Sequence, residues 1–134
     1  MEVVAAVIER DGRILICQRK SGRRHALKWE FPGGKVEPGE DSRSALTREL
    51  REELQIEATI GRRMHIETVQ YPNRPIIRLE FYHVTEFSGE PVNLDFERCV
   101  WEDRRNLAGY DFLEGDVEFV KKLAAGANRT LDSQ

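Results

Sequence analysis

A segment with the spacing of an amphipathic helix, residues 41–54, lies between segments rich in β-branched and aromatic residues. An Asp-Ser pair at its start is a plausible helix cap. Its apolar positions recur every three or four residues, at Ala45, Leu46, Leu50 and Leu54. A helix with one apolar face needs another element to cover that face, so we expect this helix to pack against a β-sheet.

The chain before the helix opens with a predicted β-hairpin. Val3–Ile8 and Ile14–Cys17 are β-rich runs, and the Asp11-Gly12 pair between them supplies the positive φ of a tight turn. Residues 31–40 contain several Pro and Gly residues and are too many for a simple turn. We therefore expect an irregular loop between the hairpin and the helix.

The chain after the helix has further β-rich segments. Ile56–Val69 and Ile76–Phe87 are predicted to be two long antiparallel strands joined by a turn at residues 71–75, and Cys99–Trp101 is predicted to be a last short strand. A carboxy-terminal helix is indicated by the apolar residues Phe112, Phe119, Val120 and Leu123. The expected fold class is α/β of the α+β kind, with a mixed, mainly antiparallel sheet between helices.

The size and composition of the chain exclude several classes of protein. Residues 1–134 have the usual size of one domain, and we expect the tail after about residue 126 to be frayed. A net charge of −3 argues against binding to long nucleic acid. The sequence shows no membrane span or signal peptide, which predicts a cytoplasmic protein, either monomer or homodimer. Cys17 and Cys99 are expected to be buried free thiols.

Three carboxylates share one ridge of the predicted helix. At about 100° per residue, Glu49, Glu52 and Glu53 fall within an arc of about 100°. Their mutual repulsion would be relieved by a divalent cation, and oxygen-only ligands favour Mg²⁺ first and Mn²⁺ second. Taken alone, the same pattern slightly favours an acidic solvent-facing helix with pairs such as Arg48 to Glu52.

The residues around this ridge decide between the two interpretations. The pattern resembles the signature of the Nudix hydrolase family at all but one position: Gly34-x5-Glu40-x7-Arg48-Glu49-Leu50-x-Glu52-Glu53-x-Gln55-Ile56. The resemblance implies a Nudix-type α/β/α sandwich. The family has glycine where this chain has Gln55, and a left-handed Gln costs about 1–2 kcal/mol, so we expect the helix end to differ here.

The resemblance also implies roles for individual residues. Members of the family bind divalent ions and use water to attack a phosphorus of a nucleoside diphosphate derivative. By their positions in the motif, the residues that correspond to the family's metal ligands are Glu49, Glu52, Glu53 and the carbonyl of Gly33. Arg48 would pair with a helix carboxylate and keep it in position, and Glu40 would support the loop. Asp95 fits the place of a further acidic ligand or base better than Glu97 does, and the general base is left open between Glu49 and Asp95.

Three further features resemble the MutT-type branch of the family: Glu30-Phe31-Pro32-Gly33-Gly34-Lys35, the hairpin ending Gln18-Arg19, and the Gly89-Glu90-Pro91 turn. That branch cleaves (deoxy)nucleoside triphosphates to the monophosphate and pyrophosphate, typically 8-oxo-dGTP. Arg19 and Lys35 are then candidate phosphate contacts, although both could be merely exposed. Asp116 corresponds to the base-recognition position. A carboxylate there could accept from the N1–H and N2 amino edge of guanine or, if protonated, also donate, and it could equally accept from a cytosine amino group; Asp116 is also a plausible helix cap. Tyr71 and Phe81 are candidates for stacking on the base, although strand aromatics more often belong to the core.

Other functions remain open at this point. The first strand and the helix also resemble relatives that prefer CTP and modified cytosine nucleotides. Hydrolysis of another nucleoside diphosphate derivative is a second enzymatic reading. A third possibility is a protein that binds a nucleotide without cleaving it and is not an enzyme. The three intact glutamates argue against this possibility.

Overall fold

The computed structural model describes residues 1–126, so the tail expected to fray lies outside the described residues. The elements are β1 (Glu2–Arg10), β2 (Arg13–Gln18), β3 (Trp29–Glu30), β4 (Gly33–Lys35), α1 (Ser42–Leu54), β5 (Glu57–Thr59), β6 (Arg63–Val69), β7 (Ile77–Val84), β8 (Glu86–Ser88), β9 (Arg98–Asp103), the 3₁₀ helices η1 (Arg104–Gly109) and η2 (Glu114–Asp116), and α2 (Val117–Gly126).

The main sheet has the strand order β3-β2-β1-β7-β6, with β4 paired to β1 and β9 paired to β2. Strands β1 and β7 run parallel, and the other pairs run antiparallel. The expected mixed, mainly antiparallel sheet is therefore confirmed. None of the helices within residues 1–126 is both long and apolar enough to cross a membrane.

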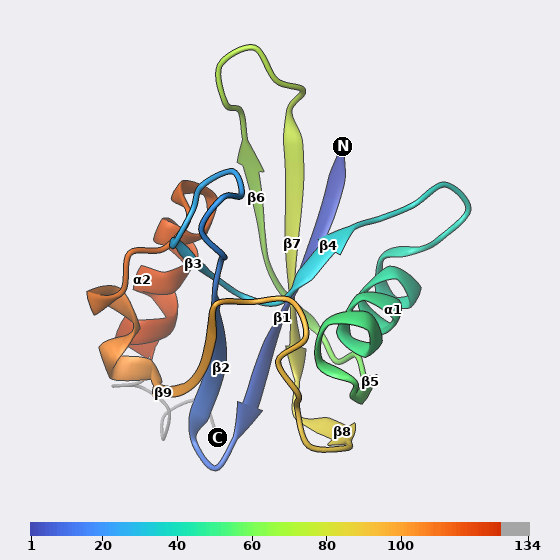
Figure 1. Cartoon of the computed structure of the whole chain (residues 1–134), viewed down its shortest axis with the longest axis vertical. Coiled ribbons are helices and arrows are strands. Elements are labelled where there is room, and N and C mark those ends of the chain that lie inside the picture. The colour runs from blue at the N-terminus through green and yellow to red at the C-terminus, as the bar shows by residue number, and fades with distance from the viewer. Residues whose placement is uncertain (127–134) are drawn as a thin grey trace.

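Helices cover both faces of this sheet, with α1 on one side and α2 on the other (Figure 1). Strand β1 lies between two cores, and its alternating side chains point to opposite faces. Val4 and Ile8 pack with Leu46 and Leu50 of α1. Val7 packs on the other face with the aromatic and aliphatic residues of α2. This arrangement confirms the α/β/α sandwich.

The opening hairpin and the first helix also agree with the sequence. Asp11 and Gly12 both have positive φ, 53° and 78°, as a two-residue hairpin turn requires. The Asp41 side chain accepts a hydrogen bond of 2.8 Å from the Ser44 backbone N–H and caps α1. Gln55 ends the helix in the left-handed conformation, at φ 57°. The expectation of a different helix end was therefore wrong, because the chain adopts the strained conformation.

The two long strands expected after α1 are each interrupted. Residues 60–62 separate β5 from β6, and β5 pairs with β8 in a separate two-stranded sheet. Gly61 donates its backbone N–H to the carbonyl oxygen of His83 at 2.8 Å. A Cβ at Gly61 would lie 2.6 Å from that oxygen, so this close backbone approach requires glycine.

Two further sequence expectations need correction. The short strand β3 lies directly before the Pro- and Gly-rich segment, and β4 lies within it; they use backbone pairing to β2 and β1 that local sequence does not reveal. Phe112 precedes α2 instead of belonging to its apolar stripe, and it forms an isolated bridge with Trp29. It still packs in the same core as Phe119 of that helix.

Candidate active site

Arg48 joins the loop before α1 to the carboxylates of the helix. Its guanidinium donates to both oxygens of Glu40 at 2.7 and 2.9 Å and to the Lys35 carbonyl at 3.1 Å. It also donates to Glu49 at 3.0 Å and to Glu52 at 3.4 Å. The bidentate bond from Arg48 lowers the pKa of Glu40 to about 2. Arg48 therefore fixes the loop to the helix.

Two glycines of β4 let the loop lie directly against these carboxylates. A Cβ at Gly34 would stand 2.5 Å from the carboxyl carbon of Glu49. A Cβ at Gly33 would overlap the carbonyl oxygen of Val4 in β1. The Gly33 backbone N–H donates to Glu53 Oε1 at 3.2 Å. A side chain at Gly34 would therefore push the loop away from the helix, and a side chain at Gly33 would push it away from β1.

Glu53 lies among other carboxylates. Burial, followed by the charges of Glu49, Glu30 and Asp95, raises the pKa of Glu53 to about 9. Burial also raises the pKa of Glu49 above its ordinary value. The carboxylates at this end of the helix therefore have too few positive partners. Part of their repulsion is avoided because the raised pKa favours the protonated form of Glu53.

Two arginines from the segment after β2 hold two other carboxylates. Arg23 donates to both oxygens of Asp95, at 2.7 and 3.2 Å, and this pair lowers the pKa of Asp95. Arg19 donates to both oxygens of Glu30, at 3.1 and 3.2 Å. Arg19, predicted to contact phosphate, is thus paired with Glu30 in this structure.

The carboxylates do not form a ready-made metal cluster, since no three His, Cys, Asp or Glu side chains among residues 1–126 converge closely enough to hold an ion. Arg48 engages Glu49 and Glu52, and Arg23 engages Asp95. The chemistry of the donors nevertheless fits a hard divalent ion. Every donor is an oxygen, and the negative charges around Glu53 lack enough positive partners.

A cavity of about 550 Å³ adjoins these groups. Seven of the residues predicted from the sequence to form the site line it: Arg19, Gly33, Lys35, Glu53, Tyr71, Asp95 and Asp116. Arg48, Glu49 and Glu52 are not among the lining residues, but Arg48 bonds to the carbonyl of the lining residue Lys35, and Glu49 lies against the lining residue Gly34. The cavity is large enough for a small organic ligand.

Phe81 does not line the cavity, so the prediction that it stacks on a base was wrong. Its side chain is fully buried, with its ring centroid 4.3 Å from that of Phe119 and 5.9 Å from that of Phe31. Strand β7 is central in the sheet, and this face of it is covered by α2. Packing of the core therefore determines the role of Phe81.

The lining of the cavity also contains a buried carboxyl group. Asp116 is 4% exposed, and burial raises the pKa of its carboxyl well above the ordinary value, although a backbone hydrogen bond from Phe31 opposes the shift. Tyr71 lies in the same lining, and its ring centroid is 4.8 Å from that of His25. The surroundings of Asp116 therefore favour its protonated form.

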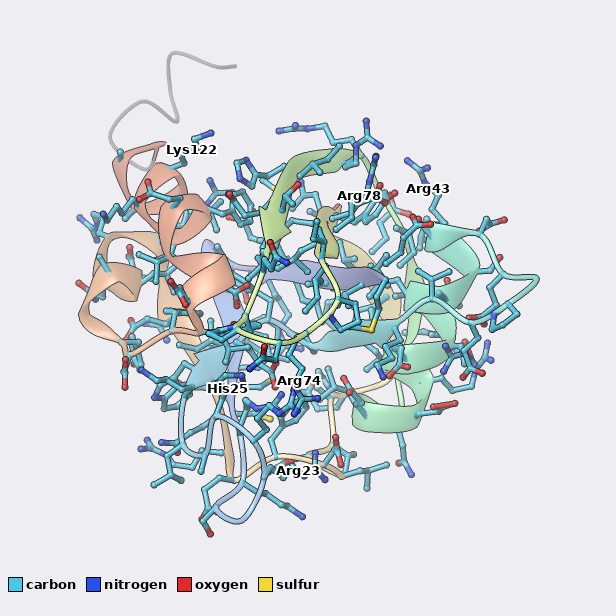
Figure 2. The ribbon with its side chains drawn as sticks, turned by 90° about the horizontal axis from the view of Figure 1, so that it is seen from above. Arg23, His25, Arg43, Arg74, Arg78 and Lys122 are labelled. Carbon is cyan, nitrogen blue, oxygen red and sulfur yellow. The ribbon has the colours of Figure 1, made fainter. Side chains whose placement is uncertain are left out.

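Five lining residues with charged or titratable side chains were not singled out as site residues from the sequence: Arg23, Arg24, His25, Glu30 and Arg74. Figure 2 shows Arg23, His25 and Arg74 gathered over the same part of the molecule, although they come from two separate loops. The basic composition of residues 21–25 was a signal in the sequence. That these residues line the cavity depends on the fold.

Comparison with known proteins agrees with this geometry. A model of the NUDIX domain matches residues 1–123. A CTP pyrophosphohydrolase of Escherichia coli is 42% identical, over 93% of this chain and 92% of its own. An 8-oxo-dGTP diphosphatase of Haemophilus influenzae is 34% identical, over 92% of this chain and 90% of its own.

Solved structures show the same likeness. The solution structure of the E. coli ORF135 protein matches with a TM-score of 0.84 and 42% identity, over 94% of this chain and 89% of that one. A MutT structure from a study of the Aliivibrio salmonicida and Vibrio cholerae enzymes matches with a TM-score of 0.77 and 30% identity, over 93% and 98% of the two chains. The chain therefore belongs to the Nudix family of hydrolases.

Proposed function

We propose that this protein is a Mg²⁺-dependent enzyme that hydrolyses (deoxy)nucleoside triphosphates to the monophosphate and pyrophosphate, with Mn²⁺ able to replace Mg²⁺. The observation that carries the proposal is Glu53, a partly buried carboxyl that accepts from the Gly33 N–H at 3.2 Å and lines a cavity together with Glu30, Asp95 and several arginines. The names of the two relatives above, a pyrophosphohydrolase and a diphosphatase of nucleoside triphosphates, support it.

The metal would be held by Glu49, Glu52, Glu53, the Gly33 carbonyl and Asp95. A bound divalent ion would neutralise the phosphoryl oxygens and lower the pKa of its water. Arg48 acts as a positioning residue, because it orients two of these carboxylates. As general base we favour Glu49 over Asp95, since burial raises the pKa of Glu49 above its ordinary value, whereas the bond with Arg23 lowers the pKa of Asp95.

The lining of the cavity supports a role for four residues in substrate binding. Arg19 and Lys35 line the cavity together with Glu53, and they would contact the phosphate chain beside the proposed metal ligands. Tyr71 and Asp116 line the same cavity and would contact the base.

The raised pKa of Asp116, which favours its protonated form, supports cytosine as the base. A neutral carboxyl donates one hydrogen bond and accepts another, and the edge of cytosine offers the complementary N3 acceptor and N4 amino donor. An ionised carboxylate would instead accept from the N1–H and N2 amino edge of guanine. The raised pKa of Asp116 therefore supports CTP or a modified cytosine nucleotide, and 8-oxo-dGTP is the second candidate.

A substrate panel tests the proposal. Pyrophosphate and monophosphate release would be measured with Mg²⁺ for CTP, dCTP, 5-methyl-dCTP, 8-oxo-dGTP and the ordinary dNTPs, with a nucleotide sugar and a dinucleoside polyphosphate included. We expect turnover of at least one triphosphate and a loss of about 100-fold or more in Glu49→Gln. Glu118→Gln, an exposed carboxylate on α2, is the matched control and should retain full activity.

Other outcomes of the panel select other functions. Turnover of the sugar or dinucleoside substrates alone would indicate a different nucleoside diphosphate derivative as substrate. Tight binding of a nucleotide that stays intact, unchanged in Glu49→Gln, would indicate a non-catalytic binding module and would overturn the proposal. A cytoplasmic location, a monomeric or homodimeric state and organisation as one domain stay predictions.

A further inference from the structure

The segment between β2 and β3 forms a loop with a fixed base. We call residues 20–27 the strap loop. Arg19 donates its backbone N–H to the Lys28 carbonyl at 2.9 Å, and the Leu27 N–H returns to the Arg19 carbonyl at 3.0 Å. The Gln18 side chain adds a bond of 3.1 Å to the Leu27 carbonyl. These bonds determine where the tip of the loop points.

The strap loop contacts the molecule on both sides of the cavity. On one side Arg23 forms its bidentate pair with Asp95, which belongs to the segment between β8 and β9. On the other side His25 packs against Tyr71, which belongs to the turn between β6 and β7. All four residues line the cavity. Arg23 is therefore a cation held at the entrance by the carboxylate assigned above to the metal.

Metal binding by Asp95 would displace Arg23. The carboxylate oxygens of Asp95 both accept from the guanidinium, so an ion that takes them replaces these bonds. The pair is partly exposed, with side-chain exposures of 44% and 36%, which keeps the cost of breaking it small. A divalent ion thus frees a guanidinium within the cavity.

The freed Arg23 would have an anion of the substrate as its partner. Glu30, a nearby carboxylate, is already bound by Arg19 at both oxygens, and Glu53 is assigned to the metal. Arg24 and Arg74 also line the cavity, so the entrance carries further positive charge. A planar guanidinium donates two parallel hydrogen bonds to phosphate as readily as to a carboxylate.

We propose that Arg23 is a substrate-binding residue that exchanges partners: it binds Asp95 in the free protein and the phosphate chain of the nucleotide once a divalent ion has taken Asp95. The inference rests on the proposed function. It assigns to the strap loop a role in ordering the two binding events, because the metal must bind Asp95 before Arg23 becomes available. Nucleotide affinity should therefore depend on prior metal binding.

The exchange predicts opposite effects of one substitution. In Arg23→Gln, Asp95 has no competing guanidinium, so Mn²⁺ binding without nucleotide, measured by electron paramagnetic resonance, should tighten about 2- to 5-fold. A non-hydrolysable nucleoside triphosphate analogue with Mg²⁺, measured by calorimetry, should bind about 10-fold or more weakly. KM should rise in parallel, with little change in kcat.

Lys122→Gln is the matched control, because it removes the same charge at an exposed residue of α2 outside the cavity lining. It should leave both affinities unchanged. Adding Asp95→Asn to Arg23→Gln should abolish the gain in Mn²⁺ affinity. Thermal unfolding of each variant would establish that it is folded.

The outcomes separate the proposal from simpler roles. If Arg23→Gln binds both Mn²⁺ and the nucleotide more weakly, Arg23 has a structural role. If it binds both more tightly, Arg23 only competes for Asp95 and does not contact phosphate. Either result overturns the exchange. Unchanged affinities overturn it too. If the wild-type protein hydrolyses a triphosphate while Arg23→Gln keeps its KM, the inference fails and the proposed function stands. If the wild-type protein binds Mn²⁺ but no nucleotide, the proposed function itself fails.

Discussion

At the scale of single residues, the surroundings raise the pKa of two carboxyl groups of the site. Glu53 has carboxylates as neighbours and receives one backbone hydrogen bond, from Gly33. Asp116 is buried in the lining of the same cavity. For both groups the folded state favours the protonated form more than the unfolded chain does, so both link the behaviour of the protein to pH.

Glu53→Gln should stabilise the metal-free protein above pH 4.5. The pKa of Glu53 rises from 4.5 to about 9 on folding, so the folded state binds more protons between these values and its stability falls as pH rises. Glutamine keeps the acceptor for the Gly33 N–H without this dependence. Urea unfolding at pH 5, 7 and 9 should show a difference that grows with pH. Glu57→Gln, which removes a partner of Arg51, should not stabilise. A constant difference would contradict the assignment.

Asp116 should make recognition of cytosine depend on pH. Its neutral form both donates and accepts, and deprotonation removes the donor, so the KM for CTP should rise as pH increases through the raised pKa of Asp116. Asp116→Asn keeps one donor and one acceptor at every pH. Its KM for CTP, measured over the same range, should stay level. An equal rise in both proteins would remove Asp116 as the cause.

At the scale of elements, α1 ends with a strained residue. Gln55 has φ 57° and ψ 35°, and its N–H bonds to the Arg51 carbonyl as in a left-handed helix cap. The β-carbon of a non-glycine residue is unfavourable there. The segment that follows keeps the helix end covered, since Val92 and Leu94 donate backbone N–H groups to the carbonyls of Leu54 and Glu53. Tertiary contacts therefore hold a conformation that the local sequence disfavours.

Gln55→Gly should stabilise the protein by about 1 kcal/mol, because glycine adopts this backbone without strain and the gain exceeds its extra entropy cost in the unfolded chain. The melting temperature, measured by circular dichroism, should rise by about 3–6 °C. Gln55→Ala keeps the β-carbon and is the control, for which we expect no increase. An equal increase in both variants would show that strain at Gln55 is not relieved by glycine.

At the scale of the whole molecule, one ion cluster connects elements that lie far apart in the chain. Glu9 of β1 bonds to His83 of β7 at 2.8 Å and to Arg104 of η1 at 2.9 Å. The hydrogen bond with His83, together with Arg104, lowers the pKa of Glu9 from 4.5 to about 2. The cluster joins the parallel strand pair of the sheet to the segment that leads toward α2.

Glu9→Gln should lose about 1–3 kcal/mol of unfolding free energy at pH 7. The lowered pKa means that this stabilisation is present above pH 4.5 and disappears as pH falls toward 2. The free energy of unfolding, measured in urea, should therefore differ strongly from that of the wild type at pH 7 and only slightly at pH 2.5. Glu67→Gln breaks a pair with His65 inside one strand and should cost less at pH 7. A larger loss for Glu67→Gln would contradict the role assigned to the cluster.

The amino-acid sequence by itself determined the parts that depend on near neighbours. The Asp11-Gly12 turn, the Asp41 cap and the ridge of Glu49, Glu52 and Glu53 follow from residues a few positions apart. The family signature is also local, since it spans one loop and one helix, and it correctly identified the α/β/α fold and the hydrolase family.

Only the tertiary structure decided which side chains share the cavity. Phe81 belongs to the core because α2 covers its face of the sheet, and Arg23 reaches Asp95 across a sequence separation of 72 residues. The interruption at Gly61 and the short strands β3 and β4 likewise depend on backbone contacts with distant strands. Local patterns cannot specify such contacts, because their energy comes from groups brought together only when the whole chain folds.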